Sequence, residues 1–348
     1  MSQSSEPPVT DPRKTLARQW LADQSPALSA LQWTLAPESL RPASSDASFR
    51  RYFRCDGHFR GQDQSLILMD APPDKESMTP FIAVADLMAQ AGLSVPRIIL
   101  TEPSLGFLLC TDLGQTTYLA ALESANQDLG VSDPLYQSAW RSLIQLQQFQ
   151  PTAPLPAYDA ARLTQEMRLF DEWYLGRHRN TSLSTSEQET LLDIYQRIVH
   201  QCLSEPTVIV HRDYHSRNLM VLERDSPGIL DFQDAVIGPM SYDLVSLLRD
   251  AYVEWPEEVQ IDWAVRYWED ARRAGLPIAS DFSDFWRAFE WMGLQRHLKV
   301  LGIFARLSYR DGKDGYLKDI PLVMRYAVNV ARRYQGLGPL AKLLERVG

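Results

Sequence analysis

The sequence predicts an α+β protein of two lobes, a small one built around an antiparallel sheet and a larger, mostly helical one. Two observations carry this prediction. Short apolar and β-branched runs bounded by turn residues lie before residue 114, and long segments of helical periodicity fill the chain after it. We therefore expect a disordered tail over 1–12, an N-terminal lobe over 13–113 and a C-terminal lobe over 114–348.

The small lobe begins with a short helix over 13–23. Two strands, SFRRYFRC and SLILMDAPP, then flank the polar segment DGHFRGQDQ, which we expect to be a loop, and prolines stop the second strand. An amphipathic helix in TPFIAVADLMAQAG precedes two more strand candidates, VPRIILTE and GFLLCTDLG. One helix among several strands fits a small α+β lobe.

The larger lobe contains a series of amphipathic segments with helical period, among them LYQSAWRSLIQLQQF, TQEMRLFDEWYLGR and EVQIDWAVRYWEDARRAG. One helix is expected to begin at Ser186, with Glu189 completing a capping box, and to run to about Leu203. The only strand signals here surround the segment from 207 to 233.

Composition excludes several classes of protein. The net charge of −9 repels a phosphate backbone, so we expect no nucleic-acid partner. Three scattered cysteines indicate neither a metal site nor a disulfide framework. The polar N-terminus lacks a signal-peptide core, and no apolar run is long enough to span a membrane. We expect a cytoplasmic protein with no obligate protein partner.

The segment HRDYHSRNLMVLERDSPGILDFQ carries the strongest chemical signal. It predicts a polar turn at His211 followed by a hairpin that brings Asn218 and Asp231 to the same side. Amide and carboxylate oxygens suit Mg²⁺, which completes its shell with water and substrate phosphates. Asp213 precedes the hairpin and can accept a proton from an attacking hydroxyl. The set is the minimum needed for phosphoryl transfer from ATP.

These residues resemble known kinase motifs. HRDYHSRN is similar to the H-R-D-x-x-x-x-N loop of the protein-kinase-like fold, and LDFQ stands where that fold carries D-F-G. The following GPMSYDLVSLLRD resembles the aminoglycoside-phosphotransferase branch. By this resemblance Asp213 is the catalytic base, and Asn218 and Asp231 hold Mg²⁺. His211 is expected to bond to backbone near Asp231 and to have a structural role.

A narrower resemblance covers nearly the whole chain. SSDASFRRYFR, LMDAPP, LDFQDAVIGP and GLQRHLKVLGIFARLSYRDGK resemble the bacterial N-acetylmuramate/N-acetylglucosamine anomeric kinases of cell-wall recycling. The resemblance implies transfer of the ATP γ-phosphate to the 1-hydroxyl of these amino sugars. It also makes CTDLG the hinge whose backbone meets adenine, around Cys110 and Asp112.

The chain departs from the kinase pattern at the phosphate-binding lysine, since Met69 or Asp70 stands in its place. A glycine-rich loop is also missing, and serine hydroxyls and other cations are the candidate substitutes. The remaining expected ATP ligands are Ser45, Ser48, Arg50 and Lys75.

Polar residues near the motifs are candidates for substrate binding or support. They are His215, Arg217, Asp234, Asp243, Arg296 and His297. Arg296, His297 and Lys299 interrupt an otherwise apolar helix, and cations there can meet the lactyl carboxylate of N-acetylmuramate. The apolar remainder of that helix is expected to be core.

Two alternatives remain open. A kinase of the same fold can act on another small alcohol such as an aminoglycoside, choline or homoserine, although the cations near Arg296 argue against a cationic acceptor. A nucleotide-binding pseudokinase is the other alternative, because the strand lysine is missing. Intact residues at Asp213, Asn218 and Asp231 argue against it.

Overall fold

A computed structural model describes residues 11–44, 49–151, 153–224 and 227–348. The described chain forms two compact units, one from residues up to Ala89 with Val95–Gly114, and the other from Gln90–Ser94 with Gln115–Gly348. An antiparallel sheet in the first unit and a mostly helical second unit confirm the predicted fold class. The short segment Gln90–Ser94, which we expected in the first lobe, packs with the second unit.

Residues 1–10 of the expected tail lie outside the described residues. The expectation was wrong for Asp11 and Pro12, which form the start of helix α1 (Pro12–Asp23). The Asp11 side chain accepts hydrogen bonds from the backbone N–H groups of Arg13 and Lys14, and Pro12 occupies the first helical turn, where its missing N–H costs nothing.

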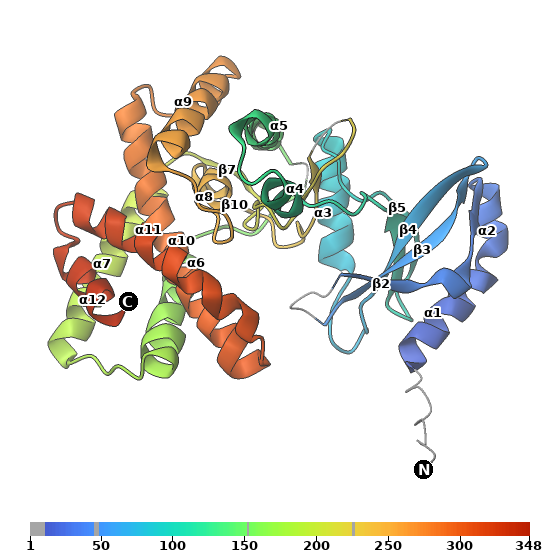
Figure 1. Ribbon diagram of the computed structural model, residues 1–348, viewed down its shortest axis with the longest axis horizontal. Helices are drawn as coiled ribbons and strands as arrows, with labels where there is room; N and C mark the ends of the chain where they lie inside the picture. Colours follow the sequence, from blue (N-terminus) through green and yellow to red (C-terminus); the bar gives the residue numbers. More distant parts are fainter. Residues whose placement is uncertain (1–10, 45–48, 152, 225–226) are drawn as a thin grey trace, which may run out of the picture. The chain divides into compact units, whose positions relative to one another are not determined.

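The first unit is built on a six-stranded antiparallel sheet. Its main path runs β1 (Trp33–Leu35), β3 (Arg51–Phe59), β4 (Gln62–Asp70), β6 (Phe107–Thr111) and β5 (Ile98–Glu102), and β2 (Arg41–Ser44) also pairs with β3. Helices α1 and α2 (Ser25–Ala30) lie on one side of the sheet and α3 (Thr79–Gln90) on the other (Figure 1). A 3₁₀ turn, η1 (Pro37–Ser39), links β1 to β2.

The segment expected to be a loop, 56–64, is mostly strand. Strands β3 and β4 continue to Phe59 and from Gln62, and only Arg60 and Gly61 remain in the turn. Both turn residues have positive φ, 52° and 79°, as a two-residue hairpin turn of the right twist requires. The polar side chains misled the prediction because they lie on the exposed end of a long hairpin.

A buried carboxylate joins helix α1 to this sheet. Asp70, at the end of β4, is fully buried and pairs with Arg13 of α1 and Arg51 of β3. Arg13 donates to it through Nε at 3.0 Å, and Arg51 donates through Nη2 at 2.6 Å. Arg13 also donates to the carbonyl of Leu105 at 2.7 Å. Asp70 therefore has a structural role.

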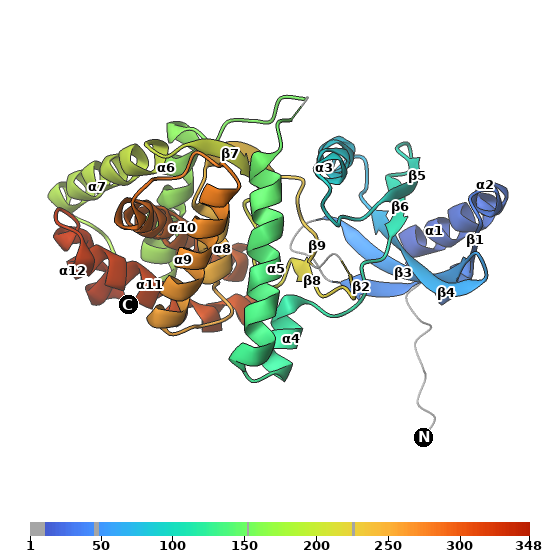
Figure 2. The ribbon, with the colours of Figure 1, turned by 90° about the horizontal axis from the view of Figure 1, so that it is seen from above.

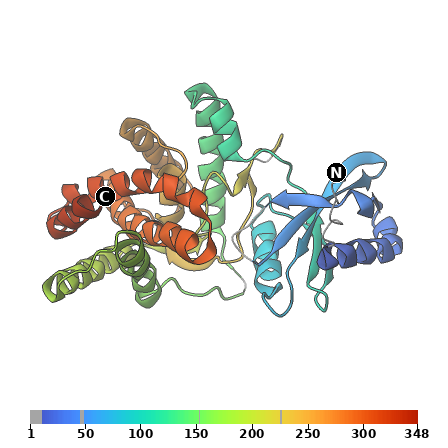
Figure 3. The same cartoon turned by 60° about the horizontal axis from the view of Figure 1, so that its bottom comes forward.

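The second unit is organised around the long helix α10 (Phe282–Asp311), labelled in Figure 2. This helix is buried along most of its length. Figure 3 shows the other helices of this unit from another side. They are α4 (Tyr118–Ser124), α5 (Leu129–Gln148), α6 (Ala160–Leu169), the π-helix η2 (Phe170–His178), α7 (Thr185–Leu203), α8 (Tyr242–Leu248), α9 (Glu257–Arg273), η3 (Asp314–Asp319), α11 (Ile320–Arg333) and α12 (Gly338–Val347). Gly302 lets α10 approach the backbone of Leu169, where a Cβ would come within 2.2 Å of the carbonyl carbon.

The capping box of α7 was predicted two residues too late. Ser184 is the N-cap, and its hydroxyl accepts the N–H of Glu187 while the Glu187 carboxylate accepts the N–H of Ser184. Ser186 and Glu189 have the same spacing, so the motif alone fits either register.

Two short hairpins lie beside the helices. Strand β7 (Thr207–Val210) pairs with β10 (Val236–Pro239), and β8 (Leu219–Met220) pairs with β9 (Gly228–Ile229). The N–H of Ile229 donates to the carbonyl of Ser94 at 2.7 Å, which attaches the segment Gln90–Ser94 to this unit. Among the described residues, no helix is long and apolar enough to cross a membrane.

We predict that Asp70→Asn destabilises the first unit, because it leaves Arg13 and Arg51 without the buried charge that they share. Breaking one side of a buried ion pair typically costs about 3–5 kcal/mol. Asp56→Asn is the matched control, since its pair with Arg41 is about half exposed on both sides and should contribute less than about 1 kcal/mol. Urea unfolding followed by tryptophan fluorescence measures both. Equal, small losses would show that Asp70 does not anchor α1.

Candidate active site

The loop that follows β7 carries Asp213 and is held by a carboxylate from α8. Asp243 is fully buried and accepts hydrogen bonds from the backbone N–H groups of His211 at 2.6 Å and Arg212 at 2.9 Å. Burial raises the pKa of Asp243 to about 7, although the two backbone donors oppose this rise. Arg212 has a φ of 79°, an uncommon conformation for a residue with a side chain, at the bend that presents Asp213.

His211 connects this loop to the strand that leads to Asp231. Its Nδ1 accepts the N–H of Asp213 at 3.2 Å, so Nε2 carries the proton and donates to the carbonyl of Leu230 at 3.0 Å. Burial lowers the pKa of His211 to about 4, which keeps the ring neutral. The predicted structural bond to backbone next to Asp231 is confirmed.

Asn218 and Asp231 lie next to each other at one end of the β8–β9 hairpin. Asn218 Nδ2 donates to the backbone carbonyl of Asp213 at 3.0 Å and lies 3.4 Å from Asp231 Oδ2. The N–H of Leu230 donates to the carbonyl of Asn218, which fixes the register. Asp231 has a φ of 60°, and Gln233 Nε2 donates to its Oδ1 at 2.8 Å. The expected base and both expected metal ligands therefore lie together.

The environment of Asp213 favours its charged form. Burial by itself would raise the pKa of this carboxyl. Nearby positive charge outweighs burial and lowers the pKa below its ordinary value; the contributing residues are Lys299, His215, Arg212 and Arg296. Asp213 is therefore ionised at neutral pH and can accept a proton.

Two of these cations share one acidic partner. Glu166 of α6 pairs with Arg212 Nη2 at 2.5 Å and with Lys299 Nζ at 3.3 Å, and it accepts a hydrogen bond from the Tyr158 hydroxyl. Lys299 also donates to the hydroxyl of Tyr242 at 2.9 Å. Burial raises the pKa of Glu166, but Lys299 and Arg212 lower it by more, so the carboxylate stays charged. This network fixes the Arg212 side chain, whose charge acts on Asp213.

Aromatic rings contact two residues that follow Asp213 in its loop. The His215 ring meets Tyr252 edge-on at 5.5 Å between centroids. The Arg217 guanidinium lies over the Tyr252 ring at 4.1 Å and within 5.4 Å of the Tyr316 ring. Such a platform can contact a sugar ring or another small acceptor.

The other candidates for substrate binding or support differ in exposure. Asp234 is exposed, and its carboxylate lies 3.8 Å from Arg212. Arg296 and His297 are buried on α10, and the His297 ring stacks on Tyr326 with 5.1 Å between centroids.

The ATP ligands expected in the first unit have internal partners or lie outside the described residues. Ser45 and Ser48 belong to the second group. Cys110 is buried in β6, and burial raises the pKa of its thiol to about 12. Asp112 accepts hydrogen bonds from Arg54 and Ser65, so its side chain is engaged within the first unit.

The cations expected there also differ. Arg50 is mostly buried and forms an ion pair with Glu76. Lys75 is exposed, with its Nζ 3.5 Å from Asp74, so it makes only a surface contact.

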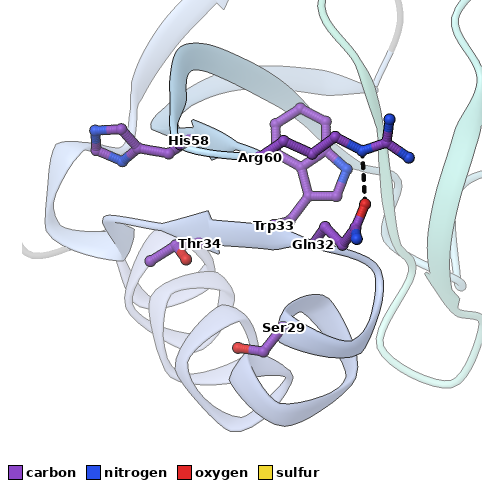
Figure 4. A pocket seen from close by; sticks show the side chains of 7 residues that line it. Ser29, Gln32, Trp33, Thr34, His58 and Arg60 are labelled. Atoms are coloured by element: carbon purple, nitrogen blue, oxygen red, sulfur yellow. Dashed lines mark hydrogen bonds between the residues drawn. The ribbon is translucent and has the colours of Figure 1, made fainter.

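A pocket of about 520 Å³ lies elsewhere in the first unit, beside β1 and the β3–β4 turn (Figure 4). Its lining includes Trp33, Thr34 and His58, and Arg60 donates to Gln32 at 2.6 Å at its rim. It contains none of the expected site residues.

Sequence reasoning missed Glu166, Gln233 and Tyr158 as parts of the site. A signal for Glu166 was present: it interrupts the apolar face of α6, between the buried Leu163 and Met167. A buried acid on such a face needs a cationic partner. Gln233 lies at the glycine position of the D-F-G-like motif, where the resemblance gave no reason to expect a side-chain role.

Comparison with known proteins agrees with this geometry. The model of the phosphotransferase enzyme family (APH) matches residues 39–281. The N-acetylmuramate/N-acetylglucosamine kinase of Pseudomonas aeruginosa is 46% identical over 93% of this chain and 94% of that protein. The protein of the same name from Neisseria meningitidis is 45% identical over 90% of this chain and 93% of its own length.

Solved structures show the fold. The ADP-bound aminoglycoside phosphotransferase APH(2'')-Ib matches with a TM-score of 0.55 at 13% identity, over 87% of this chain and 96% of that one. The choline kinase LicA of Streptococcus pneumoniae matches with a TM-score of 0.58 at 9% identity, over 89% and 99%. The family model and the curated relatives both cover most of this sequence. The chain belongs to the phosphotransferase enzyme family.

Proposed function

We propose that this protein is an ATP-dependent kinase that phosphorylates the anomeric 1-hydroxyl of N-acetylmuramate and N-acetylglucosamine, in the recycling of peptidoglycan. The carrying observation is the cluster of Asp213, Asn218 and Asp231, which hydrogen bonds hold together on one loop and one hairpin. Relatives that carry this activity in their names are 45–46% identical over at least nine tenths of both chains and support the choice of acceptor.

Asp213 serves as the base in this proposal. Its low pKa keeps the carboxylate ready to orient the acceptor hydroxyl and to take its proton as the oxygen attacks the γ-phosphate. The proton passes from the sugar hydroxyl to Asp213, the bond from the γ-phosphorus to the bridging oxygen breaks, and ADP leaves. Phosphoryl transfer depends mainly on positioning and charge stabilisation, which suits a rigid loop.

Asn218 and Asp231 fit a magnesium ion. Both supply hard oxygen ligands, and Asn218 turns its Nδ2 toward Asp213 and Asp231, which leaves its Oδ1 for a cation. No group of three His, Cys, Asp or Glu side chains gathers as a metal cage within the described ranges, so phosphate oxygens and water would complete the shell. When bound, Mg²⁺ neutralises phosphate charge.

The charges around the base favour this acceptor over cationic ones. Lys299, Arg212 and Arg296 all lower the pKa of Asp213, so the local field is positive. An aminoglycoside or choline would bring further positive charge into it. N-acetylglucosamine is neutral and N-acetylmuramate is an anion, so neither is repelled.

The proposal predicts a sugar 1-phosphate as the product. Incubation with Mg²⁺-ATP and either sugar should give a new ³¹P resonance coupled to the anomeric proton. Ethanolamine, choline and an aminoglycoside serve as competing acceptors under the same conditions. If only one of these acceptors gave a phosphate ester, that acceptor and not the amino sugar would be the substrate. Nucleotide binding without any product would favour a pseudokinase.

Asp213→Asn should lower kcat by about two to four decades, the usual contribution of a general base. The amide keeps the size of the side chain but cannot accept the proton. Unfolding temperature and ATP affinity should be nearly unchanged, which separates a chemical defect from a structural one. Full activity in this variant would exclude Asp213 as the base.

Asp231→Asn should raise the Mg²⁺ concentration needed for half-maximal activity by roughly 10-fold or more, since it removes the charged ligand. Glu223→Gln, at an exposed acid in the same hairpin, is the control for a general loss of negative charge. Isothermal titration of Mg²⁺ into the ADP complex gives a readout that does not depend on turnover. The same Mg²⁺ requirement in both variants would remove Asp231 from the metal site.

A further inference from the structure

Helix α10 carries three basic side chains within about one turn. Their contacts differ. Lys299 pairs with Glu166 and donates to the Tyr242 hydroxyl. His297 stacks on Tyr326, and burial lowers its pKa well below the ordinary value, so its ring is neutral. Arg296 is left as the charged group of this turn that has no acidic partner among the described residues.

Arg296 is only 4% exposed, and its Nε and Nη1 have no hydrogen-bond partner in the part of the chain that the structure describes. Other buried cations of this unit are paired, Arg212 with Glu166 and Arg249 with Glu290. A buried cation without a partner is costly, and buried polar groups are otherwise satisfied in native proteins. A bound anion would remove this cost.

A second unpartnered group lies in the same neighbourhood. His215 Nδ1 is buried without a hydrogen-bond partner among the described residues, and His215 belongs to the catalytic loop. The charge of Arg296 contributes to the pKa values of Asp213, His215 and Asp243, so its guanidinium lies within electrostatic range of all three. The unused donors of Arg296 therefore belong to a charge that acts on Asp213.

We propose that Arg296 binds the carboxylate of the acceptor, the lactyl group that distinguishes N-acetylmuramate from N-acetylglucosamine. This inference rests on the proposed function and adds a specificity-determining residue to it. A guanidinium presents paired N–H donors that match a carboxylate, and buried pairs of this type are strong. His215 Nδ1 supplies a further contact for the lactyl group. The phosphoryl group of ATP is the other anion that Arg296 could bind. Only N-acetylmuramate has the carboxylate, whereas both sugars receive the phosphoryl group, so a comparison of the two sugars distinguishes the two anions.

Arg296→Gln tests the proposal with both sugars. Loss of a hydrogen-bonded charge should lower kcat/KM for N-acetylmuramate by about 10- to 100-fold. The loss for N-acetylglucosamine should be much smaller, limited to the effect of the lost positive charge on Asp213. Arg296→Lys should recover part of the loss for N-acetylmuramate. With wild-type protein, kcat/KM for the methyl ester of N-acetylmuramate should fall by a similar factor relative to N-acetylmuramate. This comparison tests the carboxylate without any substitution in the protein.

Arg306→Gln is the matched control. Arg306 lies on the same helix, its Nε also lacks a partner, and its charged neighbours are Arg310, Asp311 and Glu172 rather than the catalytic loop. This variant should keep the ratio of kcat/KM between the two sugars. Unfolding temperatures of both variants show whether the fold is retained, and the methyl-ester comparison decides if Arg296→Gln does not fold.

Equal losses on both sugars would assign Arg296 to the phosphoryl group and overturn the proposal, as would no loss on either. If the wild-type protein phosphorylates neither sugar, the proposed function fails by itself. Calorimetric titration with N-acetylmuramate then decides the inference separately, because binding that does not depend on Arg296 overturns it.

Discussion

The active site depends on the two hydrogen bonds by which Asp243 holds the backbone of His211 and Arg212. The loop that carries Asp213 belongs to no helix or strand. Arg212 occupies a conformation that costs about 1–3 kcal/mol and persists only where the surrounding structure imposes it. Helix α8 is buried at every position, so the Asp243 carboxylate is a fixed anchor. The fixed loop places the backbone carbonyl of Asp213 where Asn218 Nδ2 can donate to it. The same Nδ2 also donates to Asp231, so Asn218 links the two acids.

Charge balance is the second constraint. Asp213, Asp231 and Asp243 gather in one small region, and carboxylates so close would raise one another's pKa without compensation. Lys299 and Arg212 supply the compensation, and Glu166 then neutralises part of it from α6. Because one acid is shared between two cations, this group of three side chains keeps a net positive charge. Asp213 stays ionised in these positive surroundings although the whole chain carries a net charge of −9.

The sequence predicted the parts of this site that depend on local spacing. Asp213, Asn218 and Asp231 lie on one loop and one hairpin, so their distances follow from a short stretch of chain. Glu166 lies 46 residues before Arg212 along the chain, and only helix packing brings them together. No local pattern encodes such a pair, although an acid on an apolar helix face marks that some partner is needed.

The same limit explains two other results. Three basic residues on α10 were equivalent in sequence. Only the structure shows that Lys299 is paired, that His297 is neutral and that Nε and Nη1 of Arg296 have no partner among the residues it describes. The capping box of α7 was misplaced because Ser184 and Ser186 each have a glutamate three residues later. The local patterns were sufficient to predict the fold, because alternation and helical period determine which faces are buried.

Contacts within the first unit suggest how the protein functions without the strand lysine. Asp70 cannot replace a lysine on the phosphates, because its side chain is an acid and is already paired with Arg13 and Arg51 in the first unit. Kinases of this fold place a cation on the phosphates and hold it with a glutamate. Arg50 and Glu76 form such a pair, with 13% and 17% of their side chains exposed. A guanidinium has donors for a carboxylate and a phosphate at once and does not lose its proton. We therefore propose that Arg50 replaces the lysine without a change of charge. We therefore expect the altered strand to be compatible with turnover, and the missing lysine is weak support for a pseudokinase.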